Sequence, residues 1–150
     1  MKKNLLLLFL FLLSQYSFAQ ANNEKLDSLV STFSNSVTVS GYSKGIAGII
    51  SEEYLAYNEL FKVASNEQLI ALTDHSNGIV KCYAFLALAQ KDKRLAKDIA
   101  IKHEEDNQQI EVLKGCKSSI ETVAKFMKQR SNIIEFDFTY NMRSKFVSQN

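Results

Sequence analysis

Residues 65–90 decide the fold of this chain, and they read SNEQLIALTDHSNGIVKCYAFLALAQ. Ser65 and Gln68 have the form of a capping box, in which the serine oxygen accepts a backbone N–H and the glutamine reaches back to the helix start. The polar residues 74–78 are typical turn formers, and Asn77 among them can cap a second helix. The stretch therefore predicts two helices joined by a tight turn.

The second of these helices, over residues 78–90, is apolar on two opposite sides. At about 100° per residue, one side carries Val80, Tyr83, Ala84, Ala87 and Leu88, and the other carries Cys82, Phe85, Leu86 and Ala89. A helix that is apolar all round must be covered on both sides. We expect it to be the central helix of a mostly α-helical protein, built from helical hairpins with flanking helices and a short C-terminal strand.

The same residues resemble one HEAT-like repeat. The matching positions are Asp74, Asn77, Val80, Lys81, Ala84, Ala87 and Leu88. Two positions depart from the repeat, because Gly78 stands where the family usually has proline and Lys81 replaces the usual arginine. More widely, residues 45–48, 51–54 and 115–116 are similar to a set of small exported bacterial HEAT-like proteins. The resemblance implies a scaffold that binds other proteins, and it implies no enzymatic activity.

Residues 1–19 have the form of a signal peptide. Two lysines precede an unbroken apolar run over residues 5–13, and Ala19 ends a motif of small residues that a signal peptidase reads. The run is shorter than the ~20 residues that a membrane-spanning helix needs. We therefore expect cleavage after Ala19 or after Ala21, export to the periplasm or the medium, and no transmembrane anchor in the mature chain.

The charge of the chain argues against a nucleic-acid surface. The full sequence has 18 Lys and Arg residues against 16 Asp and Glu residues. Two of the lysines lie in the signal peptide, so 18 − 2 = 16 basic residues face 16 acidic ones in the mature chain. A neutral chain without a basic run offers no footprint for nucleic acid. We expect the partner to be an envelope or extracellular protein instead.

Residues 20–50 are expected to form an N-terminal helix and a glycine-containing loop. The helix covers residues 22–35, with an amphipathic stripe made by Leu26, Leu29, Val30 and Phe33. The loop, over residues 37–50, contains Gly41, Gly45 and Gly48. A phosphate-binding loop needs Lys and Ser or Thr directly after its last glycine. Here Lys44 comes before a glycine and Ile49 follows the last one, so that motif is absent.

Residues 51–130 are expected to form the HEAT-like helical domain. Ser51 can cap a helix that ends near Ala64, with an aromatic face of Tyr54, Tyr57, Leu60 and Phe61. A further helix is expected over residues 92–103. Residues 107–117 are interpreted as a degenerate second repeat, with an extended segment over residues 109–117 as the alternative.

A last helix is expected to begin at Ser118. Ser118 to Glu121 has the form of a second capping box. The apolar stripe behind it consists of Ile120, Val123, Ala124 and Met127.

The C-terminal segment, residues 131–150, contains strand periodicity. Ile134, Phe136, Phe138 and Tyr140 alternate with polar residues. A lone strand needs a partner, either the 109–117 segment or another chain. Phe136, Phe138 and Tyr140 are therefore candidate partner-binding residues at a β-augmentation edge, with pairing inside the chain as the alternative.

The sequence predicts no catalytic, cofactor or metal site. Two histidines and two cysteines are present, without the short ligand spacing of a zinc site. His75 is interpreted as a solvated turn residue, and His103 as part of a solvated charge cluster with residues 104–106. A nucleophile elbow and an HExxH motif are also absent, so we do not expect an enzyme.

Cys82 and Cys116 form a candidate disulfide, with two buried free thiols as the alternative. Cysteines of exported proteins tend to pair, and the side of the central helix that carries Cys82 must be covered by later sequence. A bridge that closes 116 − 82 = 34 residues would stabilise the fold by ~3–4 kcal/mol in the chain-entropy model.

Two functions remain open at this level. The first is a small exported helical protein that serves as a protein–protein interaction or scaffold module in the cell envelope. The alternative is a ligand-binding protein or enzyme with a pocket near the loop over residues 41–48, where Tyr42, Tyr54 and Tyr57 would provide polar contacts.

Overall fold

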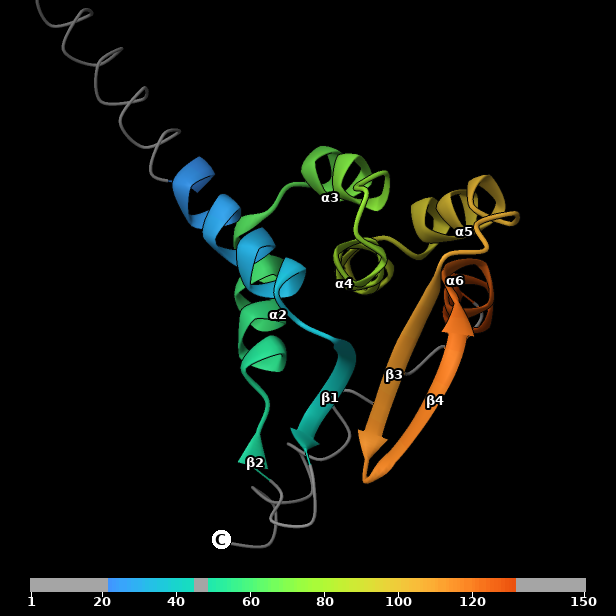
Figure 1. Cartoon of the computed structure of the whole chain (residues 1–150). Helices are drawn as coiled ribbons and strands as arrows, with labels where there is room; N and C mark the ends of the chain where they lie inside the picture. The colour runs from blue at the N-terminus through green and yellow to red at the C-terminus, as the bar shows by residue number, and fades with distance from the viewer. Residues whose placement is uncertain (1–21, 45–48, 132–150) are drawn as a thin grey trace, which may run out of the picture.

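The computed structural model describes residues 22–44 and 49–131 of the chain. It is mostly helical with a small mixed sheet, which confirms the predicted helical class and adds the sheet to it (Figure 1). A first helix includes residues 22–34. The elements that follow are β1 (Thr38–Lys44), β2 (Ile49–Ile50), α2 (Glu52–Val63), α3 (Asn66–Thr73), α4 (Gly78–Lys91), α5 (Lys93–Lys102), β3 (Gln109–Gly115), β4 (Lys117–Thr122) and α6 (Val123–Ser131).

Helix α4 is the central helix, as its two apolar sides predict. Every side chain from Cys82 to Leu88 is buried. Around it lie α2, α3, α5 and α6 (Figure 1), and it also contacts the first helix, β1 and β3. Nearly the whole core therefore forms around a single helix, which explains why that helix has no polar face.

The α3–α4 hairpin forms as its capping residues predict. Both halves of the capping box are present, since Gln68 N donates to Ser65 Oγ at 3.2 Å and Ser65 N donates to Gln68 Oε1 at 2.9 Å. Asn77 Oδ1 accepts the Ile79 N–H at 2.8 Å and so begins α4. These bonds satisfy N–H groups that have no partner inside a helix.

Gly78, the first residue of α4, lies very close to strand β3. A Cβ atom at this position would lie 2.8 Å from Ile110 Cγ2 and 3.1 Å from Gln108 Cδ. The 2.8 Å separation is too short for two carbon atoms, so a side chain here would force the packed side chain of Ile110 to shift. The glycine that departs from the HEAT-like pattern is therefore required by the contact between α4 and β3.

The first helix and α2 pack on the other side of α4 through aromatic rings. Phe33 stacks on Tyr83 with ring centroids 4.4 Å apart. Tyr54 and Tyr57 of α2 are buried, and the ring centroids of Tyr57 and Tyr83 lie 6.3 Å apart. The predicted aromatic face of the 51–64 helix thus belongs to the core, and Ser51 caps this helix by accepting the N–H of Tyr54 at 2.9 Å.

Residues 37–50 correct one prediction, because they contain strands β1 and β2 where a loop was expected. The sheet has the order β2-β1-β3-β4, with β1 antiparallel to β2 and parallel to β3. Val39 pairs with Val112 across 73 residues of sequence. That partner is too distant in sequence for a local pattern to reveal it. Because β1 and β3 share this sheet, the regions 20–50 and 51–130 pack together.

Residues 109–122 correct two further predictions, because they form an antiparallel β-hairpin. The extended alternative for residues 109–117 is confirmed, and the degenerate repeat is wrong. Ile110 and Val112 are buried while Glu111 is exposed, which is the alternation of a half-buried strand. Gly115 adopts φ +61° at the turn, a conformation that glycine reaches without steric cost.

The second capping box is also wrong, because its residues lie in β4. The last helix begins at Val123, five residues after Ser118. Ile120, expected in an apolar stripe, is 69% exposed. Glu121 instead accepts a hydrogen bond from Arg130 Nη1 at 3.0 Å, so its carboxylate joins β4 to α6. The predicted C-terminal strand lies outside the described residues.

Candidate functional site

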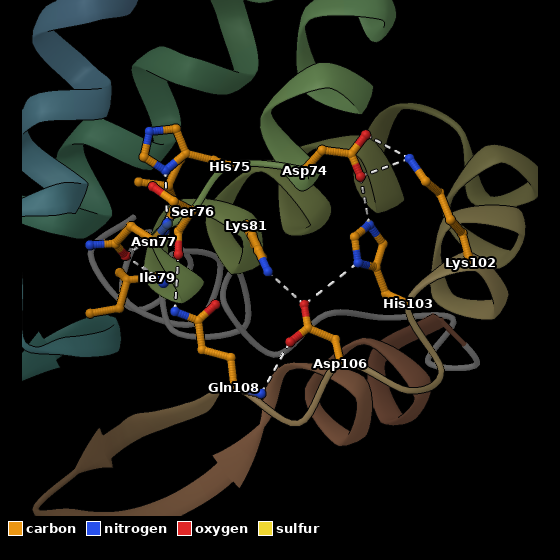
Figure 2. Close-up of polar contacts among 11 residues, drawn as sticks. Asp74, His75, Ser76, Asn77, Ile79, Lys81, Lys102, His103, Asp106 and Gln108 are labelled. Carbon is orange, nitrogen blue, oxygen red and sulfur yellow. Dashed lines mark hydrogen bonds and ion pairs between the residues drawn. The ribbon is translucent and has the colours of Figure 1, made fainter.

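A polar bridge of five side chains joins α3 and α4 to the segment after α5 (Figure 2). Its members are Asp74, Lys81, Lys102, His103 and Asp106. Lys102 Nζ lies 2.6 Å from Asp74 Oδ2, and Lys81 Nζ lies 2.6 Å from Asp106 Oδ2. The imidazole of His103 lies between the two aspartates, with Nε2 3.2 Å from Asp74 Oδ1 and Nδ1 3.6 Å from Asp106 Oδ2.

Both carboxyl groups of the polar bridge are held in the ionised form. The ammonium group of Lys102 donates to Asp74 and lowers the pKa of that carboxyl. Burial of Asp106 opposes ionisation, but hydrogen bonds from Lys81 and from the backbone N–H of Gln108 outweigh it, and the pKa of Asp106 is lowered as well. The Lys81 and Asp106 side chains are each 14% exposed, so this ion pair is shielded from solvent.

The geometry of the polar bridge is that of a structural connection. His103, expected to be a solvated residue, has a side chain only 10% exposed, because the chain turns after α5 and brings Asp106 against it. The other aspartate beside His103 is Asp74, which caps the C-terminal end of α3. Within residues 22–44 and 49–131, no group of three or more His, Cys, Asp or Glu residues is arranged to hold a metal ion.

A groove lies between α5 and α6. Its volume is about 920 Å³. Its apolar lining comes from Ala100, Ile101 and Ala124, and its charged lining from Lys97, Glu104, Lys125 and Lys128. Ile101, one of the lining residues, is 65% exposed. The groove is therefore open to solvent, and more positive than negative side chains line it.

The two cysteines do not meet. Both are free thiols, with Cys82 buried in α4 and Cys116 exposed at the tip of the β3–β4 hairpin. Figure 1 shows that this turn lies at the end of the hairpin away from α4. The candidate disulfide is therefore wrong in this structure, because the hairpin carries Cys116 away from the core. Burial raises the pKa of Cys82 far above the usual value of a thiol.

The tyrosines proposed as polar contacts of a pocket are distributed differently. Tyr54 and Tyr57 are buried in the core, and Tyr57 Oη donates to Gln90 Oε1 at 2.6 Å. Tyr42 packs edge-on against Tyr54 with ring centroids 5.2 Å apart. Residues 45–48 of the neighbouring loop lie outside the described residues.

The groove residues were not singled out in the sequence, although one signal for them was present. The buried stripe of α5 is formed by Ala96, Ile99 and Ala100, and Ile101 follows it on the next face. A large apolar residue outside the buried stripe is a candidate for a surface contact. The sequence could not show that α6 lies beside this face. The candidate partner-binding residues Phe136, Phe138 and Tyr140 lie outside the described residues.

Comparison with known proteins adds no relative. No protein-family model, curated protein or solved structure matches this chain. In the part of the chain that the structure describes, no helix combines the length and the apolar character needed to cross a membrane.

Proposed function

We propose that this protein is an exported scaffold module that binds another envelope or extracellular protein through the α5–α6 groove. The observation that supports the proposal is the open groove of about 920 Å³ with the 65% exposed Ile101 in it. A single exposed apolar residue is common on protein surfaces, but Ile101 shares this concave surface with Ala100, Ala124 and several charged side chains. Apolar surface bordered by polar residues is typical of interaction sites. Residues 1–19 would direct the chain to the envelope by the signal-peptide pattern.

The lining of the groove selects the chemistry of the partner. The lining contains one acidic residue, Glu104, and three lysines, Lys97, Lys125 and Lys128. Lysine can lay its alkyl chain along an apolar surface while its ammonium group contacts solvent or an anion. The partner that fits is a polypeptide segment that presents apolar side chains to Ile101 and carboxylates to the lysines.

The HEAT-like resemblance supports the same class of function. The α3–α4 hairpin has both caps of the pattern and a buried second helix, and HEAT-like units serve as protein-binding scaffolds. Fold resemblance alone is an analogy, so the groove carries the proposal. Phe136, Phe138 and Tyr140 are kept as a second proposed contact.

Site-specific photocrosslinking in the native cells tests this function. A photoreactive residue at Ile101 should capture one dominant exported or envelope protein after irradiation. The matched control is Leu55 on α2, an apolar residue that is 54% exposed and lies outside the groove. A product at both positions, or at neither, would contradict the proposal.

Charge reversal gives a second readout of the same experiment. The pair Lys125→Glu and Lys128→Glu changes two exposed groove residues and should lower the yield of the Ile101 product at least ~10-fold, since like charges would then face the carboxylates of the partner. Lys62→Glu on α2 is the control, because this exposed lysine lies outside the groove. An unchanged yield in the groove variant would show that the contact is not electrostatic.

A further inference from the structure

Strand β4 lies at one edge of the sheet, and among the described strands only β3 pairs with it. Its first four residues, Lys117 to Ile120, are all exposed. Ile120 is 69% exposed, and it lies opposite Glu111 on the outer face of the hairpin. An exposed edge strand with an apolar residue at its centre favours pairing with a further strand.

The register of the hairpin shows which backbone groups are available at this edge. Residues of an antiparallel strand alternate between pointing their N–H and C=O groups at the partner strand and away from it. The two-residue turn is closed by Lys117 opposite Lys114, so the backbone N–H and C=O groups of these two residues point at each other. Counting along β4 from this pair, Ser118, Ile120 and Thr122 direct their backbone groups to the open edge.

We propose that β4 pairs with β4 of a second copy of this chain, antiparallel and about a two-fold axis at Ile120. The described part of each copy has a four-stranded sheet, so pairing at β4 would join these into one sheet of 4 + 4 = 8 strands. The β4 edge shares one residue, Thr122, with the lining of the α5–α6 groove. The tests of the two proposals change residues that are not shared, so failure of one leaves the other intact.

The sequence of β4 is complementary to itself in this register. Ile120 lies opposite Ile120 of the second copy, and Ser118 lies opposite Thr122. Ile120 thus forms an apolar pair with its own copy, and such cross-strand pairs stabilise sheets. The hydroxyls of Ser118 and Thr122 keep the bonds they already make, to the Glu111 carboxylate and to the Lys125 N–H. Glu121 lies opposite Ser119 of the second copy, so no like charges lie directly opposite each other.

A second copy fits this edge better than an unrelated strand, because one surface supplies both sides of the contact. A two-fold interface uses the same patch on both partners, and the Ile120 side chains of the two copies would cover each other. Pairing through the five residues 118–122 buries less than the ~1,200 Å² of a standard interface. We therefore expect a weak dimer, with a Kd on the order of 10–1000 μM.

Cysteine crosslinking of the full mature chain tests the two-fold pairing. Directly opposite residues of a hydrogen-bonded antiparallel pair have Cα atoms ~5.5 Å apart, which is within the range of a disulfide. The variant Ile120→Cys, made with Cys116→Ser to remove the other exposed thiol, should therefore oxidise to a covalent dimer. The control is Ile101→Cys with the same Cys116→Ser change, because Ile101 is 65% exposed and lies on α5.

The expected result is that Ile120→Cys dimerises at least ~10-fold faster than Ile101→Cys at the same protein concentration. Equal rates would show random collision and would overturn the proposal. Sedimentation equilibrium without any cysteine change gives an independent measure, in which Ile120→Lys should raise the Kd at least ~10-fold. A chain that stays monomeric at millimolar concentration, including one whose edge is occupied by its own C-terminal residues, would also overturn it.

Discussion

The change Tyr83→Phe removes one buried oxygen atom and leaves two backbone groups without a partner. Tyr83 comes from α4, and both its side chain and Ser40 of β1 are fully buried. The N–H of Ser40 donates to Tyr83 Oη at 2.8 Å, and Tyr83 Oη donates to the C=O of Ser40 at 3.1 Å. The hydroxyl thus bonds the N–H and the C=O of Ser40, as the backbone of a neighbouring strand would.

The cost of this change can be worked from the two bonds. Leaving a buried donor or acceptor unsatisfied costs ~1–3 kcal/mol, so two such groups give ~2–6 kcal/mol if nothing moves. Local relaxation of β1 would recover part of this, and we expect a loss of ~2–4 kcal/mol in the free energy of unfolding. The ring remains, so the stacking of Phe33 on residue 83 is kept.

Tyr57→Phe is the matched control. Its hydroxyl donates at 2.6 Å to Oε1 of Gln90, and Gln90 is exposed. Water can replace the lost hydroxyl at the Gln90 amide, so the expected cost is ~0.5–1.5 kcal/mol. Both variants lose one oxygen from a buried tyrosine, and they differ in whether the partner can be solvated.

Urea denaturation of the mature protein, followed by circular dichroism, measures both costs. With a slope of ~1–3 kcal/mol/M, a loss of ~3 kcal/mol moves the midpoint by ~1–3 M. A Tyr83→Phe variant that is destabilised no more than Tyr57→Phe would refute the reasoning, since the Ser40 groups would then be satisfied without the hydroxyl.

Three further predictions concern the hairpin, the polar bridge and the thiols. Gly78→Ala should lower the free energy of unfolding by ~1–3 kcal/mol through overpacking against β3, although alanine is the better helix former by ~1 kcal/mol. A raised melting temperature would contradict the close approach of Gly78 to β3. The pKa values of Asp74 and Asp106 are lowered in the folded chain. Their contribution to the free energy of unfolding is therefore complete above the unfolded pKa near 4 and is lost as the pH falls through the folded pKa values. In acid titration, Asp74→Asn and Asp106→Asn should each lose less stability below pH 4 than the parent chain. Reaction of the native protein with a thiol reagent should label Cys116 quickly and Cys82 only after unfolding, whereas a native chain without any reactive thiol would restore the disulfide.

The helices near the centre of the chain could be predicted because their signals are local. Ser65 caps α3 and Asn77 caps α4 through atoms only two or three residues away. The apolar character of α4 on two sides also required it to be covered by other elements, whichever these proved to be. These interactions are encoded within one or two helical turns, so the sequence alone was enough.

The α5–α6 groove could not be predicted from the sequence. The sequence placed its candidate partner-binding residues at Phe136, Phe138 and Tyr140, which lie outside the described residues. The groove depends on α6 lying beside α5, and the sequence says little of that packing. Ile101 becomes informative only when its neighbours are known, because an isolated exposed apolar residue is common on protein surfaces.

Local sequence patterns were enough to predict the helical class, the central helix and the caps of the α3–α4 hairpin. The sheet could not be predicted in this way, because β1 and β3 come from positions about 70 residues apart in the chain and each stabilises the other as a strand. Pairing with β3 also places Ser118 to Glu121 in strand β4, although these four residues have the form of a helix cap. A local signal of ~1 kcal/mol is outweighed when a six-residue ladder and the burial of Ile110 and Val112 favour the strand.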